Sequence, residues 1–237
     1  MAIYQILPVI NGDIPTLFAI SLDSFREDRH TRMKMYEKGT EDMSSEMPSE
    51  DYLLACLRKP DAIKMVKAVD EQGTIVGFTS WRMWNFDGKY DVTTSEPTPP
   101  IRYDDPIEIP MDASLSLLNQ LGNLTSGHLS TMQARLNGPG CRTFFCLGIS
   151  VLPEYQSRGV GSALLTWVTN FADENRASCW IHLSDSLGGV KALERRRFVE
   201  VNRLEVDLDS YAQKSRAGEQ SWETYKFRYM RREANVS

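Results

Sequence analysis

The pattern of apolar and polar positions changes its period within one central segment, residues 143–172. Residues 144–152 are rich in β-branched and aromatic side chains and carry almost no charge, which is typical of a buried strand. Pro153 ends this strand because proline cannot donate to a strand ladder. Beyond it, apolar side chains recur at helical spacing at Leu164, Val168 and Phe171. The pattern predicts a strand, a short loop and an amphipathic helix.

The rest of the chain continues this alternation. Further strands are expected at residues 3–10, 63–69, 74–84, 178–183, 198–208 and 221–231. Helices are expected from about residue 13 to 25, within 26–50 ahead of a mobile loop, and at 52–58 and 190–197. Residues 70–73, Asp-Glu-Gln-Gly, are suited to a hairpin turn. Strands and helices in this order, with hairpins at both ends, predict a mixed α/β sheet.

A proline-rich insertion interrupts the pattern at residues 85–112. It contains five prolines and seven acidic residues against only two basic ones. Proline at this density cannot sustain a helix or a central strand, and so long a loop is usually functional or disordered. Residues 112–136 then show helical spacing, although Gly122 and Gly127 are expected to break or bend the helix. We expect the 237 residues to form one domain that carries this insertion.

Composition narrows the class of protein. A hydrophobic share of 41% and a charged share of 25% argue against disorder, and a net charge of −5 disfavours a nucleic-acid partner and slightly favours a cationic one. The four cysteines lack metal-ligand spacing, so we expect reduced core thiols and no metal site. Neither a signal peptide nor a membrane span is predicted, and the expected location is the cytoplasm, with the nucleus as a further option.

The loop between the central strand and its helix has the composition of an anion site. Gly159 and Gly161 leave the backbone uncovered where the orphan N–H groups and the positive dipole end of the helix favour a phosphate. The expected binding residues are Gln156, Ser157, Arg158, Gly159, Val160, Gly161 and Ser162. A P-loop would need Gly-Lys-Ser/Thr, and a dinucleotide fingerprint would need Gly or Ala where Leu164 stands. The other interpretation is a turn that only closes a strand–helix unit.

The run from Val151 to Leu165 resembles the acetyl-CoA motif of the GNAT superfamily of acetyltransferases. That motif is Gln/Arg-x-x-Gly-x-Gly/Ala directly after a strand that ends in an apolar-x-Pro turn, and here Gln156 to Gly161 fit it. The resemblance is best over residues 143–200 and extends from about 63 to 208. It implies a mixed α/β (α+β) fold, with a mostly antiparallel sheet, a splayed central pair of parallel strands and helices on both faces.

The resemblance also implies a cofactor and a reaction. An acetyl group would pass from acetyl-CoA to a primary amine by direct attack in a ternary complex. The CoA pyrophosphate would lie on residues 156–162, and the pantetheine would pair with Ile149, Ser150 and Val151. Gly148 fits this interpretation because a glycine inside a strand often marks a bulge or a close backbone approach, although a packing gap would explain it too.

The catalytic groups are harder to predict. Family members often supply a proton from a tyrosine in a Leu-Tyr-x-x-x-Gly-Phe run, but here Leu193 replaces the tyrosine and Arg197 the glycine, so this role does not transfer. The base that must deprotonate the amine is missing from residues 144–152 as well. The remaining candidates for catalytic roles are His128, Asp185, Ser186 and acids of the insertion such as Glu108. We expect His182, on a predicted buried strand, to be structural.

The acceptor stays open at this level. We predict a small-molecule amine, with a cation suited to the acidic insertion, and a peptide N-terminus or a lysine as the alternative. Residues 85–136 are predicted to cover the acceptor side. Two rival functions remain, an acyl-CoA-binding protein with little catalysis and a dinucleotide-binding oxidoreductase. Measurement of CoA and NAD(P) affinity and of acetyl transfer would separate them.

Overall fold

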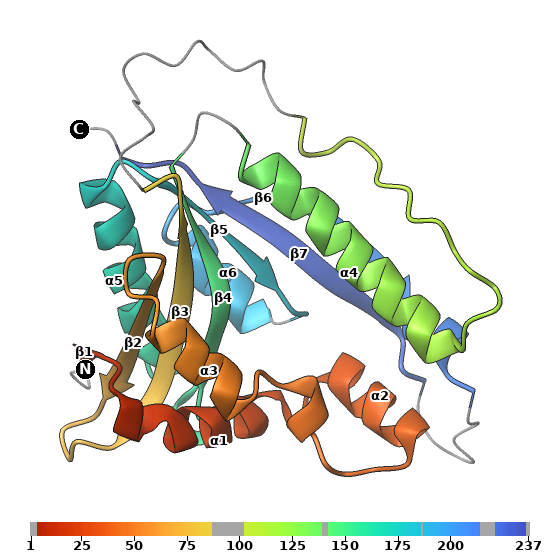
Figure 1. Ribbon diagram of the computed structural model, residues 1–237, viewed down its shortest axis with the longest axis horizontal. Coiled ribbons are helices and arrows are strands. Elements are labelled where there is room, and N and C mark those ends of the chain that lie inside the picture. The colour runs from red at the N-terminus through yellow and green to blue at the C-terminus, as the bar shows by residue number, and fades with distance from the viewer. Residues whose placement is uncertain (1–3, 87–101, 139–141, 186, 214–220, 236–237) are drawn as a thin grey trace.

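The computed structural model describes residues 4–86, 102–138, 142–185, 187–213 and 221–235. These residues form a seven-stranded sheet in the order β1-β2-β3-β4-β5-β7-β6. The strands are β1 (Gln5–Pro8), β2 (Ile63–Val69), β3 (Ile75–Trp84), β4 (Thr143–Val151), β5 (Ser178–Leu183), β6 (Val199–Asp207) and β7 (Thr224–Arg232). Neighbouring strands are antiparallel except for β4 and β5, which are parallel. The predicted mixed, mostly antiparallel sheet is therefore confirmed (Figure 1).

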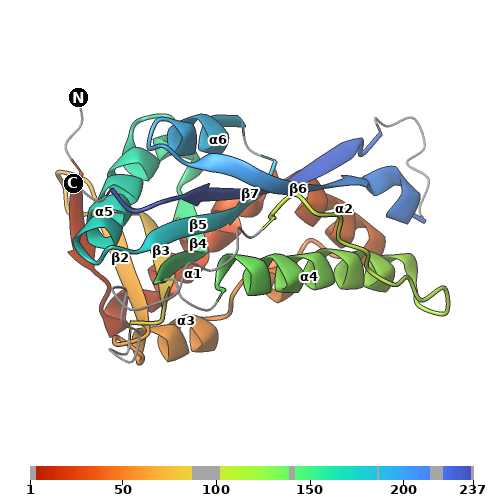
Figure 2. The same cartoon turned by 90° about the horizontal axis from the view of Figure 1, so that it is seen from above.

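Helices cover both faces of the sheet (Figure 2). One face carries α1 (Ile14–Phe25), α2 (Arg29–Lys38), α3 (Glu50–Leu57) and α4 (Leu117–Leu136), and the other carries α5 (Val160–Glu174) and α6 (Leu187–Glu194). Short 3₁₀ turns lie at Asn11–Asp13, Ser44–Glu46, Pro153–Tyr155 and Leu208–Tyr211. The faces are called below the α1–α4 face and the α5–α6 face.

Each face has its own buried side chains, because alternate residues of a strand point to opposite sides. On the α5–α6 face the core includes Phe144, Leu165, Val168, Ile181, Leu193 and Met230. On the α1–α4 face α1 and α3 pack over Met65 and Phe78, and α4 packs over Phe145, Trp180 and Tyr229. The predicted helix stripe at Leu164 and Val168 is buried as expected.

The central parallel pair opens into a gap. β4 and β5 pair only over Thr143–Phe145 and Ser178–Trp180, and beyond this point the two strands diverge (Figure 1). The register between β3 and β4 also shifts there, from Ser80 opposite Gly148 to Trp81 opposite Cys146, so that Leu147 is the extra residue of a β-bulge. The splay that the resemblance implied is thus present, with a bulge beside Gly148.

The fourth helix corrects a prediction. Gly122 and Gly127 do not interrupt α4, which runs unbroken to Leu136. A glycine inside a helix costs about 1 kcal/mol relative to alanine, whereas burial of one large apolar side chain contributes roughly 1.5–3 kcal/mol. Leu121, Met132 and Leu136 are almost completely buried, so tertiary packing outweighs the two glycines. The helix also begins later than predicted, at Leu117, because Ser116 caps it by accepting a hydrogen bond from the Asn119 N–H.

The insertion is described only in part, because residues 87–101 lie outside the described ranges together with Cys141 and Ser186. Residues 102–110 run along α4, where a side chain on Gly127 would lie 3.0 Å from the Ile109 Cδ1 atom. A side chain at position 127 would therefore require Ile109 to shift. Among the described helices, none is long and apolar enough to cross a bilayer.

Candidate functional site

The main chain of β4 turns two of its residues toward the gap. The Leu152 N–H, just beyond β4, donates to the Val76 carbonyl of β3 at 3.0 Å. In an antiparallel pair, the main-chain groups of successive residues point alternately toward and away from the neighbouring strand. Ser150 therefore also bonds to β3, whereas Ile149 and Val151 direct their N–H and C=O groups away from it. β5 has already diverged at this point, so the two N–H groups and the Ile149 carbonyl face the gap, whereas the Val151 carbonyl is bonded within the protein. Ile149 and Val151 therefore fit the predicted pairing with a pantetheine chain.

The loop after β4 is folded back onto the end of the strand. The Val151 carbonyl accepts hydrogen bonds from the Ser24 hydroxyl and from the Gln156 side-chain amide, both at 3.1 Å. Gln156, the first residue of the motif, therefore closes the loop through its side chain. Ser157 follows with a φ of 59°, a left-handed conformation that turns the chain toward the start of α5.

The N-terminus of α5 has no cap from the protein itself. Gly159 precedes the helix with a φ of 97°, and no side chain accepts from the first N–H groups. A Cβ atom on Gly161 would meet nothing closer than the Val151 Cγ2 atom, 4.0 Å away. Packing therefore does not require glycine at 161, and the open space suits a bound anion. Arg158 adds positive charge beside this space, with its guanidinium 5.8 Å from the centre of the Tyr155 ring.

The basic end of α6 supports this region rather than reaching into it. Arg196 donates to the Ser162 carbonyl at 2.6 Å and to the Thr166 hydroxyl at 3.0 Å, which ties α6 to the first turn of α5. The main chain of Arg196 in turn accepts a hydrogen bond from the Arg232 side chain. Arg197 adopts a left-handed conformation with a φ of 64°. Arg196 is thus engaged in packing.

Comparisons with known proteins agree with this geometry. Residues 130–196 match the model of the acetyltransferase (GNAT) family. Across this segment the chain is similar to the GNAT family. The predicted resemblance is confirmed, and with it the class of acetyl-CoA-dependent N-acetyltransferases and the acyl donor that the class uses. A search of curated proteins finds no match.

Solved structures share the GNAT fold over the whole chain. NAA60 of Arabidopsis thaliana, solved with a bisubstrate analogue, has a TM-score of 0.51 at 14% identity, covering 99% of this chain and 100% of the other. The ribosomal-protein-S18-alanine N-acetyltransferase of Escherichia coli gives 0.52 at 10%, covering 99% and 96%. A phosphinothricin acetyltransferase of Sinorhizobium meliloti, solved with acetyl-CoA, gives 0.51 at 12%, covering 98% and 89%. At these identities the likeness shows the fold alone.

The side chains predicted to be catalytic have different surroundings. His128 is a buried residue of α4. Its Nδ1 atom lies 3.0 Å from the Tyr229 hydroxyl, and burial lowers the pKa of its imidazole. Asp185, just beyond β5, is paired with the Arg29 guanidinium at 2.7 Å. Glu108 lies on the exposed segment along α4, and Ser186 lies outside the described residues. Their catalytic roles stay predictions.

A histidine that the sequence analysis set aside lies beside the gap. His182 is on the diverging part of β5, and its ring stacks on Tyr229 and Phe227 at centroid distances of 4.9 and 5.5 Å. No described residue forms a hydrogen bond with its ring nitrogens. Burial, then the charges of His128 and His30, lowers the pKa of His182 to about 4, so the ring is neutral near pH 7.

The three histidines of the chain thus gather over one strip of β7. His30, on α2, meets Phe227 edge-on at 5.1 Å and Tyr225 at 5.6 Å, and His128 meets Tyr229 at 5.3 Å. The described residues contain no group of three His, Cys, Asp or Glu side chains that could hold a metal ion. The sequence signal for this cluster is weak, because the histidines lie far apart, at positions 30, 128 and 182, and only the folded sheet brings them together.

Proposed function

We propose that this protein transfers an acetyl group to a small, cationic primary amine that enters from the α1–α4 face. The observation that carries the proposal is the gap between β4 and β5, which lies directly beside the uncapped N-terminus of α5. Acetyl-CoA, when bound, supplies a reactive thioester. The first residues of α5 would hold its phosphates, and the backbone of Ile149 and Val151 would hold its pantetheine chain.

The cationic acceptor is inferred from charges near the diverging end of β5. Asp28, Asp185 and Glu223 contribute three carboxylates around the single guanidinium of Arg29. This excess of negative charge favours a cation through long-range attraction. A protein N-terminus is the second candidate, because the solved relatives include the ribosomal-protein-S18-alanine N-acetyltransferase as well as a phosphinothricin acetyltransferase.

We infer that His182 accepts the proton of the acceptor amine. Its ring is neutral near pH 7, and no described residue bonds to its nitrogens. It can take the proton as the amine nitrogen bonds to the thioester carbon and becomes more acidic, after which the C–S bond breaks and the thiolate leaves; the two stacking contacts hold the ring in place. The N–H groups of Ile149 and Val151, which face the gap, are the donors that suit a developing oxyanion. Cys146 is unsuited to covalent catalysis, because burial raises the pKa of its thiol to about 12. Direct transfer to the amine is therefore the favoured route.

The proposal is tested by calorimetric titration with CoA and by acetyl transfer to a panel of amines, including 1,4-diaminobutane and an unblocked tripeptide. We expect CoA binding and turnover of the diamine. A chain that binds CoA but acetylates nothing would be the acyl-CoA-binding protein, and one that binds NAD(P) instead would be an oxidoreductase.

His182→Gln and His128→Gln then separate two candidate bases. A general base contributes typically 10²- to 10⁴-fold, so His182→Gln should lower kcat by at least about 100-fold while CoA affinity stays within about twofold. His128→Gln removes the contacts of this ring with Tyr229 and should lower kcat much less. A larger loss of kcat in His128→Gln than in His182→Gln would assign the role to His128, one of the candidates predicted from the sequence.

A further inference from the structure

Three consecutive residues at the start of α2 attach this helix to the sheet. Asp28 caps the helix by accepting from the Thr31 N–H at 2.9 Å, and its second carboxylate oxygen accepts from the Tyr225 hydroxyl at 2.5 Å. Arg29 follows, with its guanidinium 5.9 Å from the centre of the Tyr225 ring. His30 meets the edge of Phe227. All three side chains therefore point at β7 from the same end of α2.

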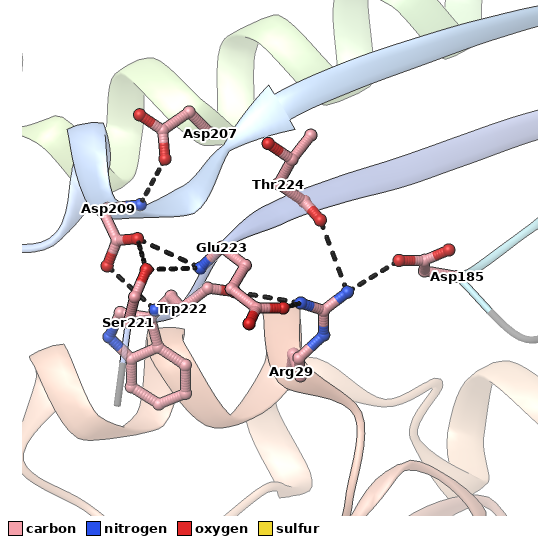
Figure 3. A network of polar contacts seen from close by, with 8 residues as sticks. All are labelled: Arg29, Asp185, Asp207, Asp209, Ser221, Trp222, Glu223 and Thr224. Atoms are coloured by element: carbon pink, nitrogen blue, oxygen red, sulfur yellow. Dashed lines mark hydrogen bonds and ion pairs between the residues drawn. The ribbon is translucent and has the colours of Figure 1, made fainter. Parts of the chain in front are cut away.

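Arg29 has the most contacts of the three (Figure 3). Its Nη2 atom donates to the Asp185 carboxylate at 2.7 Å and to the Thr224 carbonyl at 3.3 Å. Its Nη1 atom donates to the Glu223 carboxylate at 2.9 Å and to the Trp222 carbonyl at 3.2 Å. One side chain therefore joins α2 to the end of β5, 156 residues away, and to the start of β7, 194 residues away.

The partner of Arg29 at the start of β7 is itself braced. The Asp209 carboxylate accepts from the Trp222 N–H at 2.9 Å, from the Glu223 N–H at 3.0 Å and from the Ser221 hydroxyl (Figure 3). These bonds hold residues 221–223 against the residues that follow β6. The guanidinium thus binds a turn that is also held by bonds other than its own.

We propose that the ion pair of Arg29 and Asp185 forms a clamp that fixes α2 beside the gap, on the side where the acceptor is proposed to enter. Asp185 then acts as a positioning residue rather than as the proton acceptor. The inference rests on the proposed function. Asp185 lies two residues beyond β5, on the strand that diverges to form the gap, so its bond to Arg29 ties α2 to that edge of the gap. A carboxylate oxygen that receives a guanidinium at 2.7 Å is directed at that group and away from an incoming amine.

The clamp requires arginine. The fork of a guanidinium can reach two carboxylates and two carbonyls at once, whereas a lysine ammonium is a single point with three donors. Arg29→Lys should therefore behave like Arg29→Gln. Arg32, on the same helix, is a matched control because the ion pair described for it, with Glu27 at 3.4 Å, is exposed to solvent.

The test compares Arg29→Gln, Asp185→Asn, their double mutant and Arg32→Gln in the full chain. Acetyl transfer to 1,4-diaminobutane gives kcat and KM, calorimetry gives CoA affinity, and hydrogen exchange reads the backbone amides of α2. Each clamp variant should lower kcat/KM about tenfold, mainly through KM, because small displacements of binding groups have effects of this order. The double mutant should be no worse than the poorer single mutant. Exchange in α2 should speed up, while CoA affinity stays within about twofold.

Three outcomes would overturn the clamp. Asp185→Asn could lower kcat 100-fold while Arg29→Gln does not, which would make Asp185 the proton acceptor. The two effects could add in the double mutant, or exchange in α2 could match that of Arg32→Gln. If Arg29→Gln does not fold, Glu223→Gln removes only the more exposed arm of the network and should give a smaller change in the same direction. Failure of the wild-type chain to bind CoA would instead reject the proposed function, and hydrogen exchange would still decide the clamp.

Discussion

The two sides of the gap between β4 and β5 are built in different ways. The proposed cofactor side comes from one continuous stretch, residues 149–162, and offers mainly backbone N–H groups. The proposed acceptor side is assembled from residues 28–30, 182–185 and 222–229, and offers side chains that meet only after the sheet has formed. A site formed by the backbone of one segment can be recognised from a short sequence motif. A site formed by side chains from distant segments has no such motif.

Acidification should lower the free energy of unfolding, mainly through His30 and His182 on the acceptor side. Burial lowers the pKa of each to about 4, and for His30 the charge of Lys34 adds to this while Asp28 and Glu46 oppose it. Both values lie below the ordinary histidine pKa of about 6.5, so the unfolded chain binds more protons, and stability is lost as the pH falls from about 6.5 toward 4. Urea unfolding should show a loss on the order of 2 kcal/mol per histidine by about pH 5. In His182→Phe this loss should be about half as large, and an unchanged slope would contradict the assignment.

The cofactor side can be broken by one substitution in its backbone cradle. Gly161→Asp places a negative charge where a phosphate is expected, so CoA affinity should fall well over tenfold. An acidic residue in the first turn of α5 favours the helix dipole, so the folded state should not suffer. Gly122→Asp, in an open part of α4, is the matched control for the added side chain. Calorimetry that finds unchanged CoA binding in a folded Gly161→Asp protein would reject the cradle.

Substitution of Arg197 should have a smaller effect, and on stability alone. The Phe198 N–H donates to the Leu193 carbonyl at 3.2 Å, which closes α6 in the motif that usually carries glycine at its left-handed position. Arginine at a φ of 64° is strained there, and the only hydrogen bond described for its side chain is a long one, at 3.3 Å, to Asn235. Arg197→Gly should therefore raise stability by about 1 kcal/mol, read from thermal unfolding. A loss of stability would mean that the charge of Arg197 matters more than its backbone.

Substitution of Leu193 should have the smallest effect on stability and on kcat. It stands where relatives often place a tyrosine, and here it is 1% exposed in the core of the α5–α6 face. Leu193→Met conserves volume, so stability should change by less than about 1.5 kcal/mol and kcat by less than about tenfold. A severe loss of kcat in a well-folded Leu193→Met protein would show that this side chain shapes the acyl site.

These results also show how far the sequence alone could go. β2 and β5 have the predicted bounds, and α5 begins at Val160 as expected, because strand periodicity and the glycine-bearing loop are local signals. The continuity of α4 through Gly122 could not be predicted, because it depends on burial against the sheet. The position of His182 beside the gap could not be predicted either, because alternation shows that a strand residue faces inward but not what it faces.

The divergence of β4 and β5 has a thermodynamic consequence. Within the described part of the chain, the strand ladder between the half-sheet β1–β4 and the half-sheet β5–β7–β6 has only three residue pairs. A ligand that lies along β4 in the gap supplies contacts that the strands themselves do not make, and it binds only the folded chain. At a concentration of 100 times its Kd such a ligand stabilises the fold by about 2.7 kcal/mol. The amount of folded protein should therefore follow the supply of acyl donor, so that a chain deprived of its cofactor is the one most readily unfolded and degraded.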